Sequence, residues 1–459
     1  MNSKAKSGKT FSPEPVELNV EKLISGGLGL ARLNGEAILI PGALPGETLA
    51  ASLHAPAKGV RRGRILEIAA PSPFRIQPDC PLAGRCGGCD FIHVQPETAL
   101  KLKSEAALSD MAEAWGLEIS LVDSPEQAHY RTRATLHLGL GGDGKPGLGF
   151  YDDKRGLVEF DDCRLINRQL VSLAGLLRRW ALTLPVEAAT GAEFSLTLGS
   201  ERSGAFIAVS PPPPAAGGRG RRTETPKLPP ALLKSLEGLP GFLAKETPLP
   251  VGCFARPAFR GPLRPLAKSD PARLPVTVWP ELNLTLTAGP GEFTQVNPSV
   301  NKLMVGRILE LAAPLAPGRA LDLYSGHGNI ALPLARSGFR VTAVEDSPEG
   351  ARSARLNGNG LMEILHDRSE KAVEQLSRKG EKFDLIVLDP PRAGARDLAP
   401  ALAAMNPDMI IYVACHPAVL ARDVPAFVSL GYRPGHLAAL NMFPRTSHLE
   451  TILALRRNI

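Results

Sequence analysis

Cys415 is the residue of this chain with the clearest potential for chemistry. It ends the apolar run Met409–Ala414 and precedes His416 and Pro417. A thiolate is a strong nucleophile, and catalytic groups often follow a strand beside a ligand crevice. Because a lone cysteine is more often a small buried hydrophobe, Cys415 by itself leaves both interpretations open.

Glu450 is the second candidate, and its neighbours decide how it is interpreted. An isolated glutamate normally faces solvent, but Glu450 lies between the apolar residues Leu449 and Ile452 in a predicted late strand. Burial raises the pKa of a carboxyl group and suits it to the role of a general base. This position makes Glu450 a candidate base.

A glycine-containing turn upstream indicates a cofactor site. A predicted strand has Asp322 near its end. The chain then passes through the turn Gly326-His327-Gly328 into a predicted helix. Glu345 ends the next predicted strand, where a carboxylate accepts hydrogen bonds from ribose hydroxyls. The third glycine of a dinucleotide fingerprint is missing, and no phosphate-binding Gly-Lys-Ser/Thr loop follows. S-adenosylmethionine therefore fits better than NAD or ATP, and a turn that binds no cofactor is the alternative.

A second polar turn is predicted at the same edge of the sheet. Asp389-Pro390-Pro391-Arg392 follows the apolar run Leu385–Leu388. Two prolines cannot extend a central strand, so the chain must leave the sheet at this point. Polar groups at this edge face the ligand crevice of an α/β domain, and a purely structural turn is the alternative.

Four other cysteines form a pattern typical of a metal centre. Cys80, Cys86 and Cys89 are close together, two glycines separate the last two, and Cys163 is distant in sequence. Four thiolates suit either zinc or a [4Fe–4S] cluster, and the spacing alone slightly favours zinc. Cys253 is left over. Six cysteines in 459 residues do not make a disulfide scaffold.

The elements that must position these residues differ along the chain. Residues 14–72 alternate apolar and polar positions between glycine-rich turns, which predicts a small β-barrel of the OB type, a common nucleic-acid-binding fold. Its basic residues, Lys58 and Arg61-Arg62-Gly63-Arg64, favour RNA contact over a merely solvated surface. From about residue 300, strand-like and helical runs alternate, which predicts a doubly wound α/β domain with a largely parallel sheet. The clearest of these strands are Ala320–Tyr324, Val341–Val344, Leu385–Leu388 and Ile410–Ala414.

We therefore predict a multidomain protein, because 459 residues exceed one ordinary core. The expected parts are a disordered arm (1–13), the barrel (14–72), a central α+β domain (73–290) with a flexible low-complexity loop (211–230), and the α/β domain (291–459). The net charge of +7 favours a polyanionic partner. No run of about eighteen apolar residues and no secretory signal is present. We expect a cytoplasmic protein without a membrane helix and assume a monomer.

These motifs occur together in a single order, which carries more information than any one of them. They are Phe293-Thr294-Gln295-Val296-Asn297, the Asp322–Asn329 turn, Asp389-Pro390-Pro391-Arg392, Cys415-His416-Pro417 and Met442-Phe443-Pro444-x-Thr446-x-His448-x-Glu450. The combination resembles the RNA 5-methyluridine methyltransferase family, in its version with an N-terminal TRAM domain and an iron–sulfur cluster. The resemblance extends from residue 14 to about residue 455, apart from the low-complexity loop.

The resemblance implies a mechanism and a set of site residues. Cys415 would attack C6 of a uridine, C5 would take the methyl group of S-adenosylmethionine, and Glu450 would then remove the C5 proton. The residues implied to contact the cofactor are Gln295, Tyr324, Asn329, Glu345 and Asp389, with Asp367 facing the adenine. The residues implied to hold a [4Fe–4S] cluster, in a structural role and in preference to zinc, are Cys80, Cys86, Cys89 and Cys163.

The resemblance also implies an RNA substrate. Tyr130-Arg131-Thr132-Arg133 would lie near the RNA, and the target uridine must be unstacked to be reached. The barrel and the cluster favour 23S ribosomal RNA over transfer RNA. The family usually has Phe-Cys at Tyr324-Ser325, Asn at His416 and Asp at Asn441. None of these departures removes the nucleophile or the base, but His416 could alter the polarity beside Cys415.

Two other functions compete with this one. An enzyme that methylates an exocyclic amine would carry an aromatic residue where Arg392 stands, and it would have no use for Cys415 and Glu450. A non-catalytic RNA-binding protein with a degenerate methyltransferase domain would not need the intact motifs.

Overall fold

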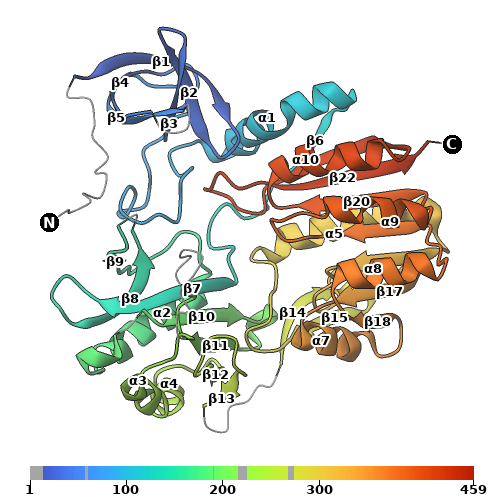
Figure 1. Cartoon of the computed structure of the whole chain (residues 1–459). Coiled ribbons are helices and arrows are strands. Elements are labelled where there is room, and N and C mark those ends of the chain that lie inside the picture. The colour runs from blue at the N-terminus through green and yellow to red at the C-terminus, as the bar shows by residue number, and fades with distance from the viewer. Residues whose placement is uncertain are drawn as a thin grey trace, which may run out of the picture.

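The computed structural model describes residues 14–56, 60–152, 154–189, 191–214, 225–266 and 273–458. The expected arm (1–13), Lys58 and the middle of the expected loop (215–224) lie outside these residues. Figure 1 shows the described chain as an N-terminal barrel, a central sheet with helices, and a larger sheet formed mainly by the C-terminal half. Within these ranges, no helix has the length and apolar character needed to cross a membrane.

Five strands of the N-terminal part close into a barrel in the order β1-β2-β3-β5-β4. Every second side chain of β4 points into the barrel and is buried, as the alternating sequence pattern requires. The predicted OB-like barrel is confirmed. Its strands are β1 (Val16–Ile24), β2 (Leu28–Leu33), β3 (Glu36–Pro41), β4 (Thr48–Leu53) and β5 (Arg61–Ala70).

The central part is a seven-stranded sheet covered by α2, α3 and α4. Helix α2 buries Leu170, Leu173 and Leu177 at helical spacing, and the side chain of Asn167 caps it by accepting a hydrogen bond from the Gln169 amide at 3.0 Å. Cys253 is buried in this core. In sheet order the strands are β13 (Arg264–Pro265), β12 (Val251–Ala255), β11 (Ala205–Ser210), β10 (Glu193–Leu198), β7 (Arg133–Leu140), β8 (Pro146–Tyr151) and β9 (Leu157–Val158). The helices are α2 (Arg168–Ala181), α3 (Pro230–Leu236) and α4 (Leu239–Glu246).

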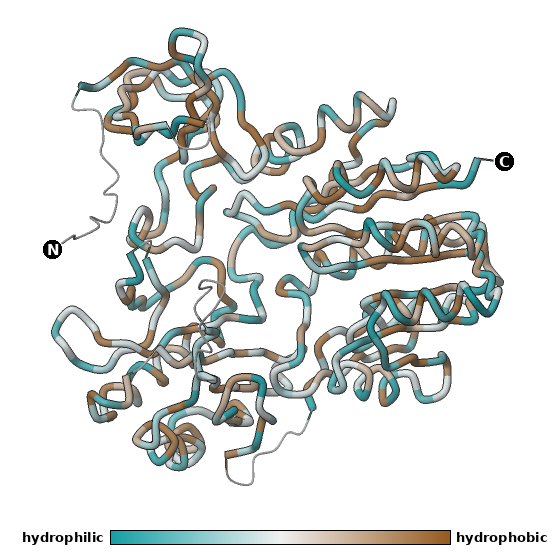
Figure 2. Tube along the Cα trace, in the orientation of Figure 1, coloured by the Kyte–Doolittle hydropathy of each residue, from teal (hydrophilic) through white to brown (hydrophobic). Residues whose placement is uncertain are grey.

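The C-terminal sheet has eight strands, in the order β18-β17-β16-β19-β20-β22-β21-β6. Strands β16 to β20 are parallel. Figure 2 shows the hydrophobic residues that lie along these strands. The predicted α/β domain is therefore confirmed. The strands are β16 (Arg319–Leu323), β17 (Arg340–Glu345), β18 (Glu363–His366), β19 (Leu385–Leu388), β20 (Met409–Ala414), β21 (Tyr432–Leu440) and β22 (Glu450–Arg457), with β6 at the edge. The helices of this part are α5 (Pro298–Ala312), α6 (Ala331–Arg336), α7 (Pro348–Gly358), α8 (Ser369–Arg378), α9 (Ala399–Ala404) and α10 (Pro417–Val428).

The strand order of this sheet reverses beside β16. The chain passes from β16 to β17 and β18 on one side, and then returns to β19 on the other side. A crevice forms at the carboxyl ends of the strands where such an order reverses, and ligands of α/β domains bind in it. The fold therefore fixes the place of the site before any side chain is considered.

Two segments that we expected in the central domain join the C-terminal sheet instead. Strand β6 (Ile119–Val122) pairs in parallel with β21, and α1 (Pro96–Trp115) packs on the same core. The hairpin of β14 (Leu274–Trp279) and β15 (Leu284–Ala288) also packs against this sheet. Periodicity identifies these elements as a helix and strands, but it does not indicate which sheet they join. The predicted boundaries at 73 and 290 therefore do not coincide with the division between the sheets.

Candidate active site and cysteine centre

One cavity of about 940 Å³ lies at the carboxyl ends of β16, β17, β19 and β20. It brings together most of the residues predicted to bind the cofactor or to react. These are Gln295, Tyr324, Asn329, Glu345, Asp389, Cys415 and Glu450. Residues that span 155 positions of the sequence therefore face one space, because most of them end, follow or begin a strand at the same edge of the sheet.

The turn after β16 has the left-handed backbone that a close approach to a ligand requires. Gly326 and Gly328 have φ values of 56° and 95°, and Tyr324 has a φ of 63° although it carries a side chain. Glu345 holds the turn, because its carboxylate oxygens accept hydrogen bonds from the amides of Gly326 at 2.8 Å and Ser347 at 2.9 Å. Burial raises the pKa of Glu345. The predicted cofactor carboxylate is thus already oriented by the backbone.

Several buried side-chain atoms at this turn have no hydrogen-bond partner among the described residues. Among them are both carboxylate oxygens of Asp322 and Nε2 of His327. Burial and the nearby Asp389 raise the pKa of Asp322 well above its ordinary range, and burial lowers the pKa of His327 to about 4. Unpaired buried acceptors are costly, so a ligand with hydrogen-bond donors is expected there. Both residues were part of the sequence motif, but only the structure identifies them as unpaired.

Two further predicted cofactor residues have different surroundings. Asn329 exchanges two side-chain hydrogen bonds of 2.8 Å with Asn301 of α5, which fixes its amide beside the cavity. Asp367 does not line the cavity, and its carboxylate lies 2.7 Å from Nζ of Lys371. The three residues that follow it, 368–370, do line the cavity. A contact between Asp367 and the adenine stays a prediction.

The two candidate reacting residues lie opposite each other on neighbouring antiparallel strands. Ala414 pairs with Thr451 in the ladder of β20 and β22, and the Thr451 hydroxyl donates to the Ala414 carbonyl at 2.9 Å. Cys415 is the residue after Ala414, and Glu450 is the residue before Thr451. The same register therefore places Cys415 opposite Glu450. Glu450 is 2% exposed, so the predicted burial of this carboxyl group is confirmed.

Negative charges surround the Cys415 thiol. Burial raises the pKa of Cys415, and the carboxyl groups of Glu450 and Asp389 raise it further. Glu450 and Asp389 also affect each other: burial raises the pKa of both, and Asp389 adds to the rise at Glu450. Two neighbouring buried carboxyl groups ionise as a pair, so one proton is held between them over a range of pH.

Arg392 is the cation that opposes this effect. It donates a hydrogen bond to the Cys415 sulfur and lowers the pKa of the thiol. The loop that follows Arg392 is held in place, because the Asp423 carboxylate accepts hydrogen bonds from the Ala395 amide and the Tyr412 hydroxyl, both at 2.8 Å. In the sequence, Arg392 argued only against another methyltransferase class, and its effect on the Cys415 thiol could not be predicted from its position.

Lys103 of α1 was also missed, and it holds the loop that leads to Glu450. The side chain is 3% exposed, and Nζ donates to Asn441 Oδ1 at 2.6 Å and to the His448 carbonyl at 3.2 Å. Burial lowers the pKa of Lys103 to about 7. The barrel reaches the same loop at Gly27, where a Cβ would stand 2.7 Å from Cβ of Ser447. No sequence signal connects α1 to this loop, since 338 positions separate Lys103 from Asn441.

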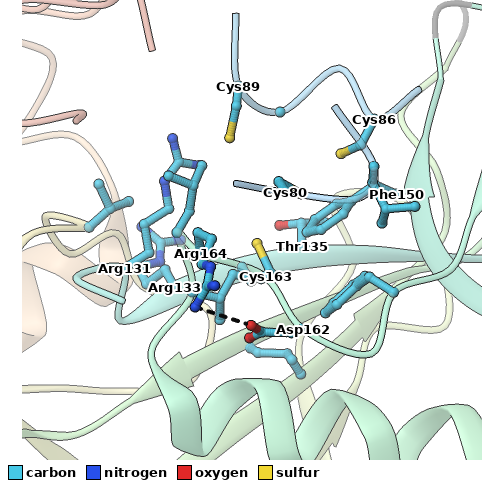
Figure 3. Close-up of a pocket in the computed structure, with 18 of the residues that line it drawn as sticks. Cys80, Cys86, Cys89, Arg131, Arg133, Thr135, Phe150, Asp162, Cys163 and Arg164 are labelled. Carbon is cyan, nitrogen blue, oxygen red and sulfur yellow. Dashed lines mark ion pairs between the residues drawn. The ribbon is translucent and has the colours of Figure 1, made fainter. Parts of the chain in front are cut away.

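The four clustered cysteines line a second cavity, of about 470 Å³. Figure 3 shows the sulfur atoms of Cys86, Cys89 and Cys163 directed toward one space, with Cys80 beside it. Burial raises the pKa of Cys89 to about 12, with the thiols of Cys163 and Cys86 adding to the rise. In the described part of the chain, no three His, Cys, Asp or Glu side chains converge closely enough to hold one metal ion.

The fold and the first cavity together define a class of protein. A parallel sheet with a glycine turn, a carboxylate at the end of the second strand and unpaired buried acceptors fits S-adenosylmethionine, whose ribose hydroxyls and amino group are donors. Cys415 and Glu450 at the same edge are the candidate nucleophile and the candidate base. The fold and the cavity together are those of a methyltransferase.

Comparisons with known proteins define the family. A family model described as tRNA (Uracil-5-)-methyltransferase matches residues 283–458. The chain is 32% identical over 466 residues to the 23S rRNA (uracil(1939)-C(5))-methyltransferase RlmD of Shewanella sp. strain W3-18-1, which covers 98% of this chain and 97% of the relative. The enzyme of that name from Alkalilimnicola ehrlichii is 31% identical over 459 residues, covering 97% of each chain.

A solved structure supports the fold over nearly the whole length. The tRNA (uracil-54, C5)-methyltransferase of Pyrococcus abyssi, in complex with S-adenosyl-L-homocysteine, superimposes with a TM-score of 0.68 at 21% identity, covering 96% of this chain and 100% of that one. The chain belongs to the RNA uracil-C5 methyltransferase family, and it is an S-adenosylmethionine-dependent enzyme. The family predicted from the order of motifs is confirmed, and the exocyclic-amine class is excluded.

Proposed function

We propose that this enzyme methylates C5 of a uridine in 23S ribosomal RNA through a covalent bond between Cys415 and C6. The observation that carries the mechanism is the placement of Cys415 opposite Glu450 at the rim of the cofactor cavity. The substrate is supported by relatives that match over nearly their full length and are named for uridine 1939 of 23S ribosomal RNA. We further propose that the enzyme acts as a cytoplasmic monomer.

The reaction needs a nucleophile because C5 of uracil is not reactive enough by itself. The Cys415 thiolate attacks C6, and the electrons of the C5–C6 double bond move to C5 and the O4 carbonyl. C5 then attacks the methyl carbon, and the bond from that carbon to the sulfonium sulfur breaks. Glu450 takes the proton from C5, the double bond reforms, and the bond between C6 and sulfur breaks to release Cys415.

The carboxyl pair of Glu450 and Asp389 has a different ionisation state before and after Cys415 bonds to C6. Arg392 partly offsets the rise in the thiol pKa that burial, Glu450 and Asp389 cause, and so favours the thiolate that must attack. Once the thiol is bonded to C6, its negative charge no longer opposes the ionisation of Glu450. Bond formation at Cys415 therefore favours the form of Glu450 that acts as a base.

The turn after β16 and the end of β17 supply the proposed cofactor contacts. Glu345 accepts hydrogen bonds from the ribose hydroxyls, and Asp322 accepts them from the amino group. Gln295, Tyr324, Asn329 and Asp389 are the other proposed contacts, with Asp367 at the adenine.

A [4Fe–4S] cluster held by Cys80, Cys86, Cys89 and Cys163 suits the second cavity better than zinc. Structural zinc needs four ligands about 2.3 Å from one ion, whereas a cluster separates its thiolates by occupying the space between them. The four cysteines line one cavity, which supports a group that occupies the space between them. We propose that its role is structural.

Metal analysis tests the cluster. Protein purified without oxygen is expected to contain iron and labile sulfide, and Cys163→Ser is expected to lose both. Cys253→Ala is the matched control, because Cys253 is also buried in the central core but lines neither cavity. One zinc per chain without iron would reject this assignment.

The RNA is proposed to pass along the arginines that link the two cavities. Arg131 lines both of them, and the guanidinium of Arg133 lies 5.1 Å from the ring centre of Phe293. Arginine side chains bind phosphates and stack on unstacked bases. Strand β5 of the barrel carries further arginines at positions 61, 62 and 64, which we propose also contact the RNA.

The decisive experiment uses RNA that contains 5-fluorouridine, because fluorine at C5 cannot be removed as a proton. The enzyme with S-adenosylmethionine is expected to form a complex with a 23S fragment that survives a denaturing gel, and Cys415→Ala is expected to form none. A complex that persists in Cys415→Ala would overturn the mechanism. Methylation of transfer RNA transcripts in place of the 23S fragment would overturn the substrate but not the mechanism.

A further inference from the structure

The segment Phe443–Glu450 ends in the proposed base, and its two half-buried polar positions outside the family motif contact the cysteine-bearing part of the chain. Arg445 has a left-handed φ of 65°, and its guanidinium forms two bonds to the Asp79 carboxylate, at 2.5 and 3.1 Å. Asp79 immediately precedes Cys80. The bidentate geometry fixes the direction of the segment as well as its distance from Cys80.

Ser447 makes a second link of the same kind. Its amide and its hydroxyl donate to the two oxygens of Asp90, at 2.7 and 2.5 Å. Asp90 immediately follows Cys89, and the amide of Phe91 donates to the Arg445 carbonyl at 3.1 Å. The loop is therefore bonded on both sides of the Cys80–Cys89 stretch.

The third part of the cysteine centre joins the same network. Arg164 immediately follows Cys163, and its Nε lies 3.5 Å from the Asp79 carboxylate. Asp79, Asp90 and Arg164 are thus each the sequence neighbour of a cysteine. Any group that holds the thiols together will hold Asp79 and Asp90 in place.

The catalytic end of the segment depends on these links, because Glu450 is the first residue of β22. On one side, Glu450 is fixed by its strand pairing with Leu440 and by the pairing of the next residue, Thr451, with Ala414. On the other side, Glu450 is fixed by the loop. Lys103 bonds the loop at Asn441 and His448 but makes no bond to the 445–447 stretch. The aspartates beside the cysteines supply the carboxylate contacts there, and Arg445 Nε also donates to the Gln127 carbonyl at 3.1 Å.

We propose that the cysteine centre positions the general base. Asp79 and Asp90, which are held beside the cysteines, fix Arg445 and Ser447. These two residues in turn fix the segment that ends in Glu450. Arg445 and Ser447 are positioning residues, since neither lines the active-site cavity. This inference rests on the proposed roles of Glu450 and the cysteines. It adds a reason why a methyltransferase that needs no redox step carries such a centre.

The order of the chemical steps gives a specific readout. Glu450 acts only after the methyl group has moved, so a displaced base slows release of the RNA and leaves the attack by Cys415 intact. Asp79→Asn and Arg445→Gln are expected to lower kcat by about tenfold or more, with an unchanged KM for S-adenosylmethionine. Methylated RNA bonded to the enzyme is expected to accumulate with ordinary uridine substrate, while the iron content stays that of the wild type.

Asp408→Asn is the matched control. Asp408 pairs with Arg457 at 2.5 Å and has 46% of its side chain exposed, against 47% for Asp79, but it lies at the opposite edge of the sheet. If Asp79→Asn and Asp408→Asn give the same kcat and no trapped RNA, the proposal fails. A wild type that forms no adduct with 5-fluorouridine RNA would instead reject the proposed mechanism, which keeps the two failures distinct.

A second measurement does not depend on turnover. Removing the metal from the holoenzyme with a chelator is expected to speed hydrogen exchange at the amides of residues 445–448, with the amides of β16 unchanged. Equal protection of residues 445–448 with and without the metal would overturn the proposal even if the Asp79 variant fails to fold.

Discussion

Cys415 and Glu450 lie opposite each other at the ends of β20 and β22, in the register that pairs Ala414 with Thr451. The antiparallel strand β22 is inserted into an otherwise parallel part of the sheet beside β20. Its direction places the start of β22 at the same edge as the end of β20. A nucleophile at a strand end and a base at a strand start therefore meet without any loop having to cross the cavity.

This relationship predicts opposite phenotypes for the two residues. Cys415→Ala is expected to abolish both the bond to RNA and turnover, because C5 is not activated. Glu450→Gln is expected to lower turnover by about a thousandfold while trapping methylated RNA on Cys415, because the C5 proton stays in place. Denaturing gels with labelled methyl donor distinguish the two outcomes. A Glu450→Gln enzyme that turns over normally would exclude this residue as the base.

The pH dependence follows from the raised pKa values of the same two groups. Cys415 must lose its proton to attack, and Glu450 must be ionised to accept one, and burial disfavours both charged forms. The single-turnover rate is therefore expected to rise from about pH 6 to pH 9. The initial rate of adduct formation with 5-fluorouridine RNA should follow the Cys415 limb alone. A rate that falls over this range would contradict the assignment.

Arg392 is expected to control how readily Cys415 loses its proton. Arg392→Gln removes the one cation that lowers the pKa of this thiol and leaves the carboxyl groups that raise it. Alkylation of Cys415 by iodoacetamide at neutral pH should slow by about tenfold, which corresponds to one pKa unit. Arg396→Gln, in the same loop region, is the control. Equal alkylation rates for the two variants would show that Arg392 does not act on the thiol.

Lys103 gives a stability prediction with a defined pH window. Its pKa is lowered to about 7 in the folded protein, whereas in the unfolded chain it is about 10.4. Between these values the unfolded chain binds more protons, so the free energy of unfolding rises with pH. The Tm of the wild type should therefore increase relative to that of Lys103→Met as the pH rises from about 7 to 10.

Lys101→Met provides the comparison for this measurement, since Lys101 is on the same helix with 70% of its side chain exposed. Its difference in Tm from the wild type should stay constant over the same range. A constant difference for Lys103→Met as well would mean that this lysine keeps an ordinary pKa.

The location of a site residue could be predicted from the sequence where it depends on the position of that residue along one strand. Glu345 and Cys415 could be placed at the cavity because their strands are apolar runs with clear ends, and parallel strands share an edge. Glu450 could be placed because its apolar neighbours predicted burial. Asp367 lacks such a marker, and the cavity is lined by the residues after it.

Contacts between distant segments could not be predicted. Asp79 and Arg445 are 366 positions apart, and nothing in either neighbourhood indicates the other. The same holds for Lys103 and Asn441, where the departure from the family pattern at Asn441 gains meaning only once the lysine is seen beside it. Side-chain pairing across domains depends on tertiary packing, which local periodicity does not encode.

The pairing of β6 with β21 constrains how the protein is made. Asp123 follows β6 and accepts a hydrogen bond from Asn441, which is 318 positions later, so the edge of the catalytic sheet stays open until nearly the whole chain has left the ribosome. The barrel, formed by residues 16–70 alone, can fold early during translation. The newborn chain thus has its barrel, which we propose contacts RNA, long before it has a closed catalytic sheet, and the order of synthesis separates the formation of these two parts.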